Sequence, residues 1–243
     1  MDLNGRSAVV TGGAHRVGRA IALALAERGC SLVVHYHRSR EAAEQTAKEA
    51  ERLGVRATPI GADLRQLGGV HGLFEHVDRA FDRLDVLVNS AAILEPVDLL
   101  AASEADWQST IDLNLKAAFF CLQAAARRMH SSGGGAVVNI SDVAGQRAWS
   151  RYPIHSISKA GLDMLTRTAA LALAPDIRVN GVAPGPVEKP AGMTDLRWRE
   201  IGGALPLRRP GTAADVAAAV VFCLENEYLV GETIPVDGGD LVS

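Results

Sequence analysis

The sequence has few cysteines and no long apolar run. Its three cysteines, Cys30, Cys121 and Cys223, lie far apart and form no Cys-x-x-Cys pair, which argues against a disulfide framework or a zinc site and suits a reducing compartment. The longest apolar stretch, near Ala117 to Ala126, is too short to cross a bilayer, and the first residues do not have the pattern of a signal peptide. We therefore expect a cytoplasmic protein without a membrane anchor.

The sequence also lacks an excess of charge of either sign. Its 25 basic and 28 acidic side chains give a net charge of −3 and are scattered along the chain, which argues against binding to nucleic acid or to an anionic bilayer. No Pro- or Ser-rich linker, internal repeat or low-complexity tract divides the 243 residues, of which 48% are apolar. These features predict one globular domain, residues 1–243, whose partners are small molecules or copies of itself.

What the sequence does contain is an alternation of short β-branched runs with longer stretches of helical period. This alternation is typical of βαβ units around a parallel sheet that is covered on both faces. It predicts a single-domain, Rossmann-like, doubly wound α/β fold with seven parallel strands. The strands are expected at Ser7–Val10, Ser31–His35, Ala57–Gly61, Asp85–Val88, Ala136–Ile140, Arg178–Val182 and Glu232–Val236. The helices are expected at Val17–Arg28, Arg40–Leu53, Gly69–Phe81, Trp107–Met129, Tyr152–Leu173 and Ala213–Leu224.

One long segment does not follow this alternation. The stretch from Ala183 to Gly211 is rich in proline and has no clean periodicity. A connection of this length inside a compact domain is more often functional than a plain loop. We therefore expect it to be a substrate lid.

A glycine-rich turn follows the first predicted strand and opens the first predicted helix. It reads Thr-Gly-Gly-Ala-His-Arg-Val-Gly-Arg from Thr11 to Arg19. Glycines in such a turn let the backbone approach a pyrophosphate, whose charge is favoured by free N–H groups and by the helix dipole. The spacing differs from the usual Gly-x-Gly-x-x-Gly, so a plain tight turn is the alternative. The residues expected at the diphosphate are Gly12, His15, Arg16, Val17 and Gly18, with His15 a neighbour of the phosphates rather than a titrating group.

The end of the second predicted strand indicates which dinucleotide is bound. An NAD site needs a carboxylate there for the ribose 2′-hydroxyl, whereas the 2′-phosphate of NADP(H) needs cations and other donors. The strand ends His-Tyr-His-Arg-Ser at residues 35–39 and offers no acid. We expect Arg38 and Arg16 to face the phosphate, with His37 and the Ser39 hydroxyl beside it, which favours NADP(H). The alternative is that Arg38 caps a solvated loop.

These motifs resemble those of the short-chain dehydrogenase/reductase family over nearly the whole chain. The phosphate loop is similar to the family's Thr-Gly-x-x-x-Gly-x-Gly, with Arg16 in place of the middle glycine. Other positions that match are Asp63 and Leu64 in the adenine turn, Asn89 and Ala91 in the Asn-Asn-Ala-Gly segment, Pro184, Gly185 and Val187 in the nicotinamide-side turn, and Val236–Gly239. Arg16 and residues 35–39 are closest to the pteridine reductase branch, which implies NADPH. The family also implies a homotetramer.

The resemblance also implies the catalytic residues. The family's Tyr-x-x-x-Lys pair corresponds to His155 and Lys159, which a spacing of four residues places on one helix face, so a histidine replaces the proton-donating tyrosine. Asp142 stands where the family usually has serine, again as in pteridine reductases, and Asn114 matches a helix-embedded asparagine. Reduction by NADPH needs an acid beside the reacting carbon, and this set could supply it.

The residues leave the proton donor open. If the Asp142 carboxylate dominates, His155 is an imidazolium that protonates the substrate while Lys159 binds the ribose hydroxyls. If the Lys159 ammonium dominates, His155 is neutral, and the proton comes from Asp142 or from water. A further alternative is that His155 is a tolerated helix residue in a protein that has lost its acid.

The substrate is less well defined than the cofactor. Pteridine reductases place an aromatic ring after the Asn-Asn-Ala segment, but residues 92–95 are Ala, Ile, Leu and Glu. Trp149 and Trp198 are the candidates for such a ring, and the alternative for each is core packing or a contact between subunits. We expect an NADPH-dependent oxidoreductase that reduces a pteridine-like C=N bond or a small carbonyl. The alternatives are a reductase of 3-oxoacyl thioesters or other ketones, and an NADP(H)-binding subunit with little turnover. No pair of histidines has the spacing of metal ligands, so no metal is expected.

Overall fold

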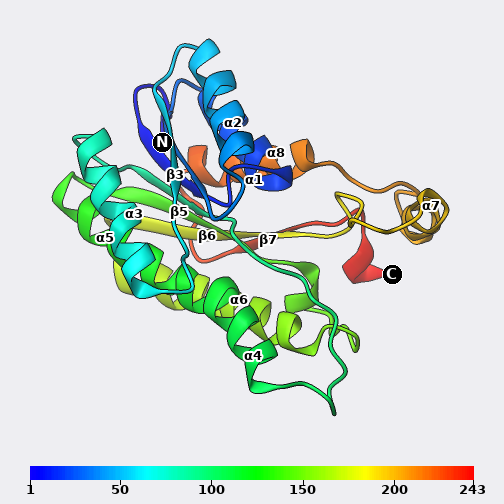
Figure 1. Cartoon of the computed structure of the whole chain (residues 1–243). Helices are drawn as coiled ribbons and strands as arrows, with labels where there is room; N and C mark the ends of the chain where they lie inside the picture. The colour runs from blue at the N-terminus through cyan, green and yellow to red at the C-terminus, as the bar shows by residue number, and fades with distance from the viewer.

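A computed structural model describes residues 1–243 and contains one parallel sheet of seven strands (Figure 1). The strand order is β3-β2-β1-β4-β5-β6-β7, so the direction of winding reverses between β1 and β4. This order confirms the predicted doubly wound sheet, with small shifts at the strand ends. The strands are β1 (Ser7–Thr11), β2 (Ser31–Tyr36), β3 (Ala57–Gly61), β4 (Val86–Asn89), β5 (Gly135–Ile140), β6 (Ile177–Pro184) and β7 (Thr233–Val236).

Helices cover both faces of the sheet (Figure 1). One face carries α1 (Arg16–Ala26), α2 (Arg40–Arg52) and α8 (Ala213–Glu225), and the other carries α3 (Leu67–Ala80), α5 (Ala117–Ser131) and α6 (Pro153–Leu173). Because successive side chains of a strand point to opposite faces, Val10 packs in the first of two buried clusters and its neighbour Val9 in the second. The strands are therefore apolar on both sides, which is why they are visible as short continuous apolar runs.

The helix predicted over Trp107–Met129 is present as one continuous helical stretch, but it begins earlier, at Glu104, and contains a π-helical turn. This segment is divided into α4 (Glu104–Ile111), a π-helical turn η1 (Asp112–Lys116) and α5. The π-helical turn contains Asn114, whose side chain is buried and bonds to the backbone of Ile93. A single π-helical turn inside an α-helix does not interrupt the helical backbone, so the segment is predicted as one helix.

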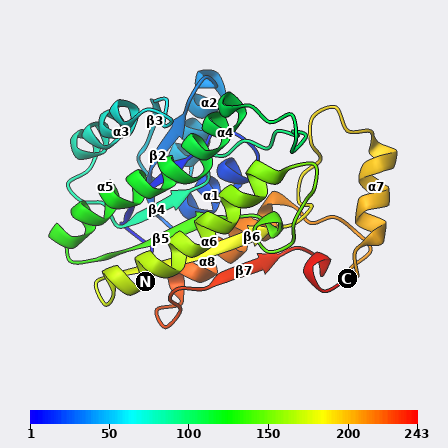
Figure 2. The same ribbon diagram turned by 90° about the horizontal axis from the view of Figure 1, so that it is seen from below.

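The proline-rich segment contains a helix that its sequence pattern does not predict. Helix α7 (Asp195–Ala204) begins at Thr194, whose side chain accepts a hydrogen bond from the N–H of Arg197. Only Gly202 is buried, so the helix has no apolar stripe. Figure 2 shows α7 standing away from the sheet, beside the C-terminal end of the chain.

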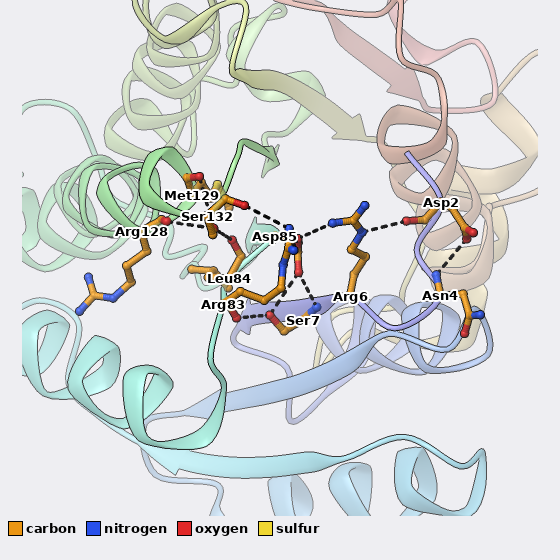
Figure 3. Close-up of polar contacts among 10 residues, drawn as sticks. All are labelled: Asp2, Asn4, Arg6, Ser7, Arg83, Leu84, Asp85, Arg128, Met129 and Ser132. Carbon is orange, nitrogen blue, oxygen red and sulfur yellow. Dashed lines mark hydrogen bonds and ion pairs between the residues drawn. The ribbon is translucent and has the colours of Figure 1, made fainter.

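A buried carboxylate joins the amino-terminal ends of two central strands (Figure 3). Asp85 is 1% exposed and accepts a hydrogen bond from the N–H of Ser7 at 3.0 Å. Its other oxygen accepts hydrogen bonds from Arg6 at 3.0 Å and from Arg83 at 2.8 Å. These contacts fix the start of β1 against the start of β4.

Replacing Asp85 by alanine is expected to lower the free energy of unfolding by about 2–3 kcal/mol. The Ser7 N–H would be left buried without its partner, and two guanidinium groups would lose a shared carboxylate. Urea unfolding measures the change. Asp78→Ala is the control, since Asp78 pairs with Arg128 at the surface, where a pair contributes about 0–1 kcal/mol. Equal losses in the two variants would contradict the role assigned to Asp85.

The three cysteines are enclosed by the core. Cys30, Cys121 and Cys223 are each 0% exposed and form no disulfide. Burial raises the pKa of the thiols of Cys30 and Cys121 to about 12 and that of Cys223 to about 11. All three thiols are therefore protonated at neutral pH. In the same structure, no helix combines the length and the apolar character that crossing a membrane would require.

Candidate active site

A pocket of about 470 Å³ lies at the carboxyl ends of β1 to β4, where the strand order reverses. In doubly wound folds this crevice is the usual place for a ligand. The predicted cofactor residues that line it are Gly12, His15, Arg16, Val17, Gly18, His37, Asp63, Leu64 and Ala91. Four separate loops thus bring most of the predicted set together.

The loop between β1 and α1 lets a ligand approach the backbone closely. Gly12 has a φ of +67°, which favours glycine, and a Cβ added to Gly18 would lie 2.2 Å from the Gly12 carbonyl oxygen. The N-cap residue of α1, His15, makes no side-chain capping hydrogen bond. The N–H groups of the first turn therefore stay available for an anion, and this donor set fits the pyrophosphate of a dinucleotide.

Arg16 connects the phosphate loop to the segment that follows β6. Its Nε lies 2.8 Å from the Glu188 carboxylate, and its terminal nitrogens donate to the carbonyl oxygens of Glu188 and Lys189, each at 3.3 Å. Arg16 has a φ of +52°, in the left-handed region, which explains why a glycine commonly occupies this position in similar loops. Its guanidinium is thus shared between the pocket and the segment after β6.

The residues predicted to face a 2′-phosphate lie only partly in the pocket. His37 lines it, whereas Arg38 is exposed and Ser39 is the N-cap residue of α2. A cation that the sequence analysis missed, Arg65, also lines it and forms two hydrogen bonds with Asp63, at 2.9 and 2.7 Å. These bonds hold the pKa of Asp63 at about 2. The only sequence signal for Arg65 is its place two residues after Asp63.

Other predicted cofactor residues lie outside this pocket. Asn89 is buried and donates to the carbonyl oxygen of Ala118 at 3.2 Å and to the side chain of Asn139 at 3.0 Å, so it ties β4 to α5 and β5. Pro184 ends β6, and the N–H of Gly185 bonds to the carbonyl oxygen of Val236. Val187 packs against the buried cluster of α1, α2 and α8.

The four predicted catalytic residues lie together beside the pocket. Asp142 follows β5, where one carboxylate oxygen accepts the N–H of Ala144 at 2.8 Å. The other oxygen lies 3.5 Å from Nε2 of His155, which is in the first turn of α6 and is 3% exposed. Asn114 reaches the opposite ring nitrogen from the π-helical turn, with Nδ2 3.3 Å from Nδ1 of His155.

The hydrogen bonds around His155 assign one of its ring protons. Nδ1 of His155 is 3.1 Å from the carbonyl oxygen of Ile93. Nδ2 of Asn114 donates one hydrogen to that same carbonyl oxygen at 3.0 Å and its other hydrogen to Ser158 Oγ at 3.1 Å. Nδ1 must therefore carry a hydrogen and donate it to Ile93. Nε2 is buried, forms no hydrogen bond, and lies 3.5 Å from the Asp142 carboxylate.

Lys159 lies one helical turn after His155 and is 4% exposed. Its Nζ donates to the carbonyl oxygen of Ile140 at 2.8 Å and forms no ion pair. Burial lowers the pKa of Lys159, while the charges of Asp142 and Asp163 oppose that shift. Because Nζ of Lys159 is directed at the main chain of β5, Asp142 is the charged side chain that faces the His155 ring.

The aromatic residues near the site pack on each other. The rings of Trp149 and Tyr152 meet edge to face, with their centroids 6.0 Å apart, and Tyr152 precedes the first residue of α6. Trp198 lies on α7 and does not line the pocket. No group of three or more His, Cys, Asp or Glu side chains is placed to hold a metal ion.

The chain is similar to known proteins over nearly its whole length. The model of the family described as enoyl-(acyl carrier protein) reductase matches residues 12–240. The chain is 36% identical over 239 residues to the 3-oxoacyl-[acyl-carrier-protein] reductase FabG of Staphylococcus aureus, covering 96% of this chain and 97% of that protein. It is 35% identical over 247 residues to the 2-dehydro-3-deoxy-D-gluconate 5-dehydrogenase of Escherichia coli, covering 98% and 96%. Among solved structures, the acetoin dehydrogenase YohF of Salmonella typhimurium matches with a TM-score of 0.89 and 33% identity, covering 96% and 95%.

Proposed function

Because this chain belongs to the short-chain dehydrogenase/reductase family, a family of oxidoreductases, we propose that it reduces the ketone of a 3-oxoacyl thioester with NADPH. The similarity to FabG supports this substrate class. The pteridine substrate that the motifs around Arg16 suggest is not supported, because the relatives named above act on ketones or alcohols and residues 92–95 supply no aromatic ring. The 3-oxoacyl alternative therefore replaces it.

One observation carries the proposal: the buried ring of His155 is held by its Nδ1 and presents Nε2 to Asp142. The Asp142 carboxylate lies 3.5 Å from Nε2 and is the acceptor placed to receive a hydrogen from this nitrogen. Between the two alternatives for the donor, this arrangement supports the one in which Asp142 dominates and His155 protonates the substrate.

The roles of the chain's own groups follow from this arrangement. When bound, NADPH supplies a hydride to the carbonyl carbon. His155 donates its Nε2 proton to the carbonyl oxygen, and Asp142 stabilises the charged ring before the transfer. The Ile93 carbonyl holds the ring through Nδ1, and Asn114 bonds to the same carbonyl. Lys159, held by the Ile140 carbonyl, is assigned to the ribose hydroxyls by resemblance to the family.

We propose NADPH as the cofactor because β2 ends without an acid, and Arg38 there is exposed and forms no ion pair. Titration followed by NADPH fluorescence is expected to give tighter binding than for NADH. Arg38→Ala is expected to weaken NADPH binding by about tenfold or more, since a charge-assisted hydrogen bond contributes about 1.5–3 kcal/mol, and to leave NADH binding unchanged. The control is Arg40→Ala, whose side chain pairs with Glu44. Equal affinities for the two nucleotides would overturn the preference.

We also propose that the enzyme is a cytoplasmic homotetramer and that residues 183–211 act as its substrate lid. The outward faces of α5 and α6 support the assembly, because several large apolar side chains are exposed there. They are Phe119, Ile157, Met164 and Leu171. The contacts of Arg16 with Glu188 and Lys189 support the lid, because they tie its first residues to the phosphate loop.

A further inference from the structure

One buried side chain joins the two loops that face each other across the cofactor pocket. His35 lies near the end of β2 and is 3% exposed. Its Nδ1 accepts a hydrogen bond from the N–H of Gly12 at 3.1 Å, and its Nε2 lies 3.0 Å from the carbonyl oxygen of Ala62. Gly12 belongs to the phosphate loop, and Ala62 begins the turn that contains Asp63. The ring therefore spans the base of the pocket from one loop to the other.

The two partners of His35 fix its tautomer. A backbone N–H can only donate and a carbonyl oxygen can only accept, so Nδ1 is bare and Nε2 carries the hydrogen. Burial lowers the pKa of His35 to about 4, which keeps the ring neutral at neutral pH. The ring places a hydrogen-bond acceptor and a donor on opposite sides, so that each faces one loop. The amide of an asparagine or a glutamine also has an acceptor and a donor, but both are on the same carbon atom and cannot span the two loops.

Main-chain bonds hold the same two loops to β2. The N–H of Gly13 donates to the carbonyl oxygen of His35 at 2.9 Å, and the N–H of Ala62 donates to the carbonyl oxygen of Tyr36 at 3.0 Å. The ring of His35 adds a side chain that forms a hydrogen bond with each of the two loops. Since it also occupies the Gly12 N–H, the anion at this site must rely on the first turn of α1 for its donors.

We propose that His35 is a positioning residue that sets the separation between the phosphate loop and the adenine turn. A dinucleotide must contact both loops at once, so its affinity depends on the distance between them. The affinity of a fragment that contacts only one loop does not depend on this distance. The inference rests on the proposed function only in taking the ligand to be a nicotinamide dinucleotide. No proton or hydride passes through His35.

Three substitutions separate the two hydrogen bonds of the ring. His35→Asn keeps an acceptor near the place of Nδ1 and loses the bond to Ala62. His35→Gln keeps a donor near the place of Nε2 and loses the bond to Gly12, and His35→Leu loses both. Binding of NADPH, NADH and adenosine to each variant is measured by calorimetry at a temperature well below unfolding. The control is His76→Gln, because His76 is exposed on α3 and bonds only within its own helix.

The expected result is a loss of dinucleotide affinity of about tenfold or more in His35→Leu and a smaller loss in the Asn and Gln variants. The affinity for adenosine, which has no phosphate to reach the phosphate loop, should stay near that of the wild type, and kcat at saturating NADPH should be unchanged while its KM rises. Unchanged dinucleotide affinity, even with a lower melting temperature, would overturn the inference. An equal loss for adenosine would also overturn it, because the effect would then be local to the adenine turn.

This experiment also distinguishes failure of the inference from failure of the proposed function. If neither NADPH nor NADH binds to the wild type, the proposed function is wrong. If either nucleotide binds to the wild type and binds equally well to His35→Leu, only the role of His35 is wrong.

Discussion

Replacing His155 by glutamine is expected to lower kcat by about 10²–10⁴-fold without changing the affinity for NADPH. A positioned general acid contributes roughly this factor, and the glutamine amide cannot release a proton to the carbonyl oxygen. The His155 ring touches Asp142, Asn114 and Ile93 but no residue of the phosphate loop, so NADPH binding should be retained. Steady-state kinetics with a 3-oxoacyl thioester, together with NADPH fluorescence, separate the two effects.

The control for this substitution is His130→Gln, since His130 is exposed on α5 and pairs only with Asp176. His155→Tyr, which restores the family's residue, tests whether the wild-type site has lost its acid. If His155 is the working acid, the tyrosine variant loses activity and its pH–rate profile changes. A large gain in kcat would instead identify the wild type as an NADP(H)-binding subunit. A full rate in His155→Gln would assign the proton to Asp142 or to water.

Gly18→Ala is expected to weaken NADPH binding by more than about 100-fold, equivalent to about 2.7 kcal/mol, and to lower the free energy of unfolding by about 1–3 kcal/mol. The added Cβ would lie 2.2 Å from the Gly12 carbonyl oxygen and 2.9 Å from the Gly12 carbonyl carbon. Both are backbone atoms, so the phosphate loop must move away from α1. Fluorescence titration and urea unfolding measure the two losses.

Gly72→Ala provides the matched control for Gly18→Ala. Gly72 lies inside α3, and a Cβ there has no atom within 4 Å. Alanine should stabilise this helix by about 0.5–1 kcal/mol and leave NADPH binding unchanged. Wild-type affinity in Gly18→Ala would contradict the tight loop geometry described above.

Most of the sheet could be predicted because each strand is a short apolar run that can be recognised from its own residues. β4, for example, has apolar side chains on both faces and ends at Asn89, where the turn to the pocket begins. The strand order could also be anticipated, because right-handed crossovers leave few ways to wind such a sheet. Helix α7 could not be predicted, since a helix that buries only Gly202 has no apolar periodicity to detect.

In the candidate site, too, the features that depend on local spacing could be predicted from the sequence, and those that depend on distant contacts could not. The spacing of His155 and Lys159 within one helix already places both side chains on one face. The tautomer of His155 depends instead on how Asn114 distributes its two amide hydrogens between Ile93 and Ser158. The pairs of Arg16 with Glu188 and of Arg65 with Asp63 depend on side-chain orientation. No motif in the sequence specifies such choices.

The three enclosed thiols have a practical consequence for following the lid. None of them is accessible as a thiolate at neutral pH, so they should not react with a maleimide. A cysteine introduced in place of Leu196, which is 62% exposed on α7, would be the single reactive thiol of the native chain. A dye attached there would test whether this helix moves when nucleotide is added, with no need to remove natural cysteines first.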